Sequence, residues 1–74
     1  MIPVVVTNTT LERFDAFCRA IDGEGADQSN ISSFGPCHSI LLLTPNICFR
    51  LQQHHPELGH ALEILLDQWE KHQP

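Results

Sequence analysis

The fold depends on residues 39–44, Ser39-Ile40-Leu41-Leu42-Leu43-Thr44, which are aliphatic at four consecutive positions. Strands with apolar residues at every position usually have both faces covered, so this stretch predicts a strand at the centre of a sheet. Side chains alternate along a strand, which places Ile40 and Leu42 on one face and Leu41 and Leu43 on the other. The remaining elements are assigned outward from this strand.

Four elements are predicted before it. Residues 2–6 form a β-branched run and predict a first strand. Thr9 and Glu12 have the spacing of a capping box, and the apolar stripe that follows predicts a helix ending near residues 22–23. This stripe consists of Leu11, Phe14, Phe17, Cys18 and Ile21. Residues 23–30 are polar and rich in glycine, which predicts a loop, and residues 31–34 predict a short edge strand.

Residues 44–53 support two interpretations. Ile47, Phe49 and Leu51 alternate with Cys48, Arg50 and Gln52, and this period of two favours a strand. Thr44-Pro45 instead resembles an N-cap followed by proline at the first helical position, which favours a helix. We predict the strand because the alternation is longer than the cap signal. The alternative is a mostly helical protein in which 44–53 is a helix.

A second amphipathic helix is predicted over residues 56–72. The fold class is therefore α/β of the α+β type, a single domain over residues 1–74 with the order β-α-(β)-β-β-α. We expect a small two-layer sandwich, with two helices packed on one face of a three- to four-stranded mixed sheet. A crossover through the first helix predicts that strand 2–6 runs parallel to its neighbour.

Composition limits the function classes. The chain is 42% hydrophobic and 18% charged, which predicts a folded protein. Its net charge of −5 opposes binding to phosphate backbones and anionic lipids, so neither nucleic acid nor a membrane is an expected partner. The three cysteines lack the spacing of a disulfide framework, and the first residues lack the basic region of a signal peptide. These features predict a cytoplasmic protein.

No catalytic, nucleotide or phosphate-loop motif is present in the sequence. We therefore expect no enzyme activity, no cofactor and no small-molecule substrate. The cysteines and histidines are the main alternative, because they could serve a metal- or thiol-dependent protein. They are Cys37-His38, Cys48, His54-His55 and His60. Their spacing does not match the paired ligands of known zinc motifs, so no metal site is predicted.

The central strand carries the functional prediction. If the helices cover one face, two aliphatic side chains remain bare on the other, and an isolated monomer seldom leaves such a patch exposed. We predict that Leu41 and Leu43 form this patch together with Cys48 and Arg50. Phe34, Trp69 and an acidic helix face could extend the contact. That face carries Glu63, Asp67 and Glu70.

The sequence thus predicts a small acidic protein-interaction module. It would be a regulator or inhibitor that binds a partner protein, a second copy of itself, or both. Compact acidic chains of this length are common among phage and plasmid accessory proteins, anti-defence inhibitors included. The two alternatives are the Cys/His protein described above and an acidic nucleic-acid mimic that uses Glu63, Asp67 and Glu70.

Overall fold

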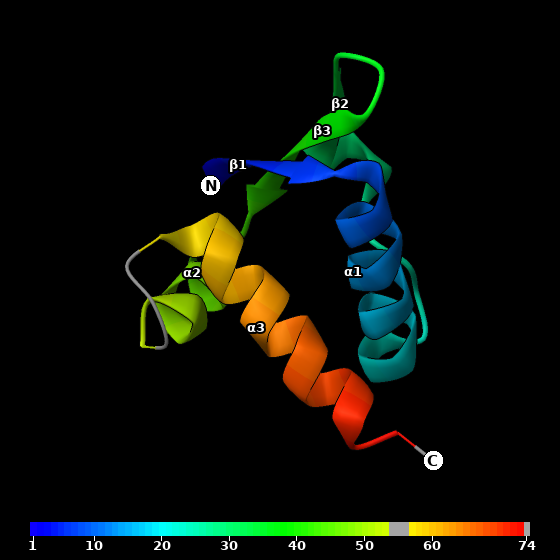
Figure 1. The fold of residues 1–74 in the computed structure, drawn as a ribbon, viewed down its shortest axis with the longest axis vertical. Helices are drawn as coiled ribbons and strands as arrows, with labels where there is room; N and C mark the ends of the chain where they lie inside the picture. Colours follow the sequence, from blue (N-terminus) through cyan, green and yellow to red (C-terminus); the bar gives the residue numbers. More distant parts are fainter. Residues whose placement is uncertain (54–56, 74) are drawn as a thin grey trace.

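A computed structural model describes residues 1–53 and 57–73. In chain order its elements are β1 (Ile2–Thr7), α1 (Asn8–Asp22), the short 3-10 helix η1 (Gln28–Asn30), β2 (Ile31–Phe34), β3 (His38–Leu43), α2 (Pro45–Gln52) and α3 (Leu58–Lys71). The α1, α2 and α3 helices all lie on the same side of the sheet (Figure 1). The predicted α+β class is confirmed, although α2 adds a helix to the two that were expected.

The sheet has the order β1-β3-β2, so β3 is central, as predicted from its aliphatic run. Both of its neighbours are antiparallel, and Ile40 pairs with Val5 on one side and with Ser32 on the other. The predictions of a mixed sheet and of a parallel neighbour for strand 2–6 are therefore wrong. The chain does pass through α1 between two strands of the same direction, β1 and β2, but the β2–β3 hairpin inserts β3 between them.

The α1 helix begins earlier than the capping-box pattern predicted. Thr7 is the N-cap, and its hydroxyl oxygen accepts a hydrogen bond from the Thr10 amide at 3.1 Å. The predicted end is confirmed, because Gly23 adopts a left-handed conformation with φ 76° and its amide donates to the Arg19 carbonyl. Glycine adopts this conformation without the steric cost that a Cβ imposes, so it ends the helix cleanly.

The strand prediction for residues 44–53 is wrong, and the helical alternative is correct. The Thr44 hydroxyl accepts from the Ile47 amide at 3.4 Å, and Pro45 lies in the first turn of α2. Helical periodicity then brings Cys48 and Leu51 to the core, where they are 4% and 0% exposed. The Thr44 cap therefore decides the structure of this segment, and the alternation of apolar residues does not. The two residues that α2 buries, Cys48 and Leu51, are three positions apart, which is a helical spacing.

The core lies between the sheet and the helices. Its largest fully buried side chains are leucines from β3, α2 and α3, namely Leu41, Leu43, Leu51, Leu62 and Leu66. The α1 helix adds Phe14, which is 4% exposed. Among the helices of the described residues, none has the combination of length and apolar character that a bilayer crossing requires.

Candidate interaction surfaces

The predicted patch is not where the sequence placed it. Leu41 and Leu43 are 2% and 0% exposed, since they face the helices and not the solvent. Cys48 is buried as well, with its Sγ 3.7 Å from the carbonyl oxygen of Leu43. Arg50 is exposed, but it lies on α2 and not on a strand. The prediction of the patch was wrong because it treated Ile47, Phe49 and Leu51 as one face of a strand, whereas these residues lie on a helix.

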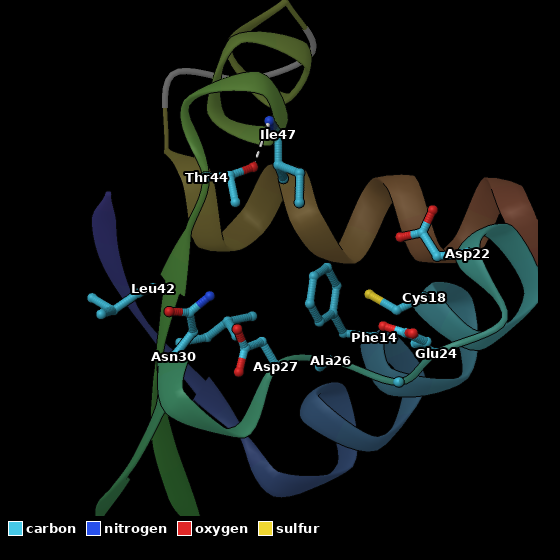
Figure 2. A pocket seen from close by; sticks show the side chains of 12 residues that line it. Phe14, Cys18, Asp22, Glu24, Ala26, Asp27, Asn30, Leu42, Thr44 and Ile47 are labelled. Atoms are coloured by element: carbon cyan, nitrogen blue, oxygen red, sulfur yellow. Dashed lines mark hydrogen bonds between the residues drawn. The ribbon is translucent and has the colours of Figure 1, made fainter.

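The uncovered apolar surface is the other face of the same sheet. We call it the open face, and it consists of Pro3, Val5, Thr7, Ser32, Phe34, His38, Ile40 and Leu42. The register and the alternation of side chains place these residues on one side. Figure 2 shows the Leu42 side chain across β3 from Phe14, which lies in the helix-facing layer. Val5 and Phe34, one on each edge strand, are 51% and 53% exposed.

The open face contains no acidic residue and no lysine or arginine. In fact β1, β2 and β3, all of them within the described residues, contain neither lysine, arginine, aspartate nor glutamate. This distribution is uneven, because the whole chain has nine Asp+Glu and four Lys+Arg. Val5 was not predicted as an interaction residue, although the absence of charge in residues 2–6, 31–34 and 39–44 is a sequence signal for this surface.

The acidic residues of α3 mostly serve the protein's own packing. The Arg13 guanidinium of α1 holds Glu70 with two hydrogen bonds, of 3.0 Å from Nε and 2.7 Å from Nη2, and it also pairs with Asp67. The Thr10 hydroxyl donates to Glu63 Oε1 at 3.5 Å. The hydrogen bonds from Arg13 lower the pKa of Glu70 below its ordinary value. Part of the row predicted to meet a partner therefore joins α3 to α1.

Among the described residues the cysteines do not lie in one site, whereas His38 and His60 line the same hollow beside β1. Cys37 precedes β3 and Cys48 follows it, so the six residues of the strand separate them, a span of about 20 Å. Within the described ranges no group of three His, Cys, Asp or Glu residues could hold a metal ion. His54 and His55, which the alternative hypothesis includes, lie outside the described residues.

A pocket of about 240 Å³ lies between α1, β3 and the loop before η1 (Figure 2). Phe14 and Ile47 provide apolar walls, and Cys18 places a thiol in it. Burial raises the pKa of this thiol first, and the charges of Asp22 and Asp15 raise it further. A thiol in this environment stays protonated at neutral pH and is a weak nucleophile, so the pocket provides no support for thiol catalysis.

Two larger hollows lie on the helical layer, and both are lined by Arg50 of α2 and by its C-cap residue Gln53. The first, of about 600 Å³, has apolar walls made by Phe17, Leu65 and Trp69. The second, of about 650 Å³, lies beside Phe49, whose ring is 66% exposed. Phe17 and Trp69 meet edge to face, with ring centroids 5.5 Å apart.

Comparison of the chain with protein-family models, with curated proteins and with solved structures finds no match.

Proposed function

We propose that this protein is a small, non-enzymatic interaction module that acts as a regulator or inhibitor by binding a partner protein through its open face. The observation that carries the proposal is the one-sided placement of the helices, which leaves an apolar, uncharged sheet face in solvent. Covering apolar surface stabilises a complex by about 25 cal/mol per Å². The expected partner surface is therefore apolar and uncharged at its centre.

The size of the open face favours a foreign partner over a second copy. The six residues of β1 and of β3 span about 20 Å, β2 is shorter with four residues, and three strands are about 14 Å wide, so the footprint is at most roughly 300 Å². Stable interfaces bury about 800 Å² on each partner. Two open faces packed together alone would fall well short of that area. A larger partner that also reaches the flanking loops can use this face as the apolar centre of a wider interface.

The proposal includes a cytoplasmic location. All three cysteines, Cys18, Cys37 and Cys48, are free thiols in the described structure. Free thiols persist in reducing compartments, whereas small secreted domains of this size usually rely on disulfides. The location remains part of the proposal and is tested together with the partner.

Paired lysine substitutions test the open face. We expect immobilised wild-type protein to retain a partner from its host that Val5→Lys and Phe34→Lys no longer retain, because a buried lysine ammonium costs several kcal/mol. Ala20→Lys, on an exposed turn of α1, is the matched control and should retain the partner. Circular dichroism establishes that each variant is folded. The proposal is wrong if the folded open-face variants bind that partner as the wild type does.

The salt dependence of binding distinguishes the open face from a nucleic-acid mimic, and light scattering distinguishes a foreign partner from a second copy. Binding through an uncharged apolar face should persist in 0.5 M salt, at about which the screening length falls to a few Å. A nucleic-acid mimic acting through Glu63, Asp67 and Glu70 would lose its partner under the same conditions. Light scattering at micromolar concentration should show a monomer. A dimer that Val5→Lys dissociates would replace the foreign partner with a second copy.

A further inference from the structure

A second uncovered surface lies on the helical layer, where residues of α1, α2 and α3 line the hollows. The two hollows described above meet at Arg50 and Gln53, which line both of them. We call the combined surface the Arg50 groove. Its residues are separate from those of the open face, so its argument does not depend on the function proposed above.

The apolar part of the Arg50 groove is substantial for a protein of this size. Phe17, Leu65 and Trp69 line the first hollow together with Ile21, which is 59% exposed. Phe49, at 66% exposure, lies in the second. Exposed aromatic and branched aliphatic side chains around a hollow are typical of surfaces that receive apolar anchors from a partner.

The charge of the groove is opposite to that of the chain. The chain has nine Asp+Glu, yet among the described residues none of them lines either hollow. The polar lining includes Gln53 and Arg50. Arg13 and Arg19 are held by intrachain carboxylates, whereas Arg50 has no ion pair within the part of the chain that the structure describes. A guanidinium between two apolar hollows is complementary to a carboxylate flanked by two apolar side chains.

We propose that the Arg50 groove binds an amphipathic helix of a partner protein, with one apolar side chain in each hollow and an Asp or Glu between them paired with Arg50. A helix presents side chains on one face at intervals of three, four and seven residues, which suits two anchors with a carboxylate between them. Arg50 lies in the last turn of α2 and Gln53 is its C-cap residue, so the guanidinium and the amide can both donate to that carboxylate.

The chain's single tryptophan, Trp69, lies in the first hollow and reports occupancy directly. The probe is an acetylated and amidated alanine-based helical peptide with leucines seven residues apart and a glutamate between them, and its partner peptide has glutamine in place of the glutamate. We expect the glutamate peptide to move the emission of Trp69 to shorter wavelength. We expect it to bind about tenfold more tightly than the glutamine peptide, the difference of about 1.4 kcal/mol that one charged hydrogen-bonded pair supplies.

Variants assign the preference to the guanidinium. Arg50→Gln should bind the two peptides equally, Arg50→Lys should keep part of the preference, and Arg19→Gln should keep all of it because Arg19 pairs with Asp15 on α1. Val5→Lys should also leave it unchanged, which keeps this test separate from that of the open face. The proposal is overturned if neither peptide changes Trp69 emission up to millimolar concentration. It is equally overturned if the wild type does not discriminate, or if folded Arg50→Gln still prefers glutamate.

Discussion

The two faces of β3 have nearly the same chemistry and opposite surroundings. Leu41 and Leu43 are packed beneath the helices at 2% and 0% exposure, whereas Ile40 and Leu42 lie on the open face and are half-buried. The three helices of the described chain are all used on one side. The difference shows that, in a short protein, an apolar side chain is buried in the core only when a helix or strand is available to cover it.

The largest difference between a covered and an uncovered site should appear in thiol reactivity. Cys48 is 4% exposed and Cys37 is exposed, so an aromatic disulfide reagent should label Cys37 about a thousandfold faster or more. Labelling of Cys48 requires unfolding, which costs at least several kcal/mol in a stable domain. Half-buried Cys18 should react at an intermediate rate, since burial raises its pKa. Mass analysis of labelled peptides measures the order. Equal rates for Cys37 and Cys48 in native buffer would show that α2 does not protect its cysteine.

A pair of alanine substitutions measures how much a side chain on each face of β3 contributes to the free energy of unfolding. Leu43→Ala should lower the free energy of unfolding by about 2–5 kcal/mol, because it leaves a cavity among fully buried side chains. Leu42→Ala should cost about 1 kcal/mol or less, since the side chain is only half-buried. Urea denaturation followed by circular dichroism provides both values.

A third variant keeps the comparison interpretable if Leu43→Ala does not fold. Leu43→Met keeps the side-chain volume and should cost less than about 1.5 kcal/mol, so it remains folded and shows that the loss in Leu43→Ala comes from the cavity. If Leu42→Ala proved as costly as Leu43→Ala, the open face would be covered in the folded protein, and the proposed function would lose its basis.

Local chemistry explains which elements could be predicted from the sequence. The end of α1 at Gly23 and the central place of β3 follow from a left-handed glycine and from an aliphatic run, and both predictions are confirmed. The strand prediction for residues 44–53 was wrong because two local signals conflicted. The hydroxyl of Thr44 caps a helix through a contact three residues away, whereas the alternation of apolar residues has no such contact to enforce it.

Contacts distant in sequence account for the remaining errors. The pairing of β1 with β3 determines the direction of β1 relative to its neighbour, and it joins segments distant in sequence, so no short segment contains that information. The alternation of side chains along a strand also places Leu41 and Leu42 on opposite faces, but it does not determine which face the helices cover. Arg50, predicted as an interaction residue, is exposed on α2, and its role stays a prediction. The acidic face of α3 was predicted correctly as a surface, but its contact with Arg13 depends on how α1 and α3 pack.

The smallest expected effect concerns the ion pairs of Arg13 on α1 with α3, which add exposed charges to the Phe17–Trp69 contact between the same helices. Hydrogen bonds from Arg13 lower the pKa of Glu70 in the folded state from its ordinary value of 4.5. The folded protein therefore binds fewer protons than the unfolded chain in this range, so the contribution to stability is complete above pH 4.5 and is lost as the pH falls through the lowered pKa. Arg13→Gln should reduce the melting temperature slightly at pH 7, and its melting curve should converge with that of the wild type as the pH falls through the lowered pKa of Glu70. Arg19→Gln is the matched control, because it removes the analogous hydrogen bond to Asp15 within α1 while leaving the contact with α3 intact. A gap between wild type and Arg13→Gln that stays constant from pH 7 to 3 would assign the effect to lost packing of the Arg13 side chain and not to its charge.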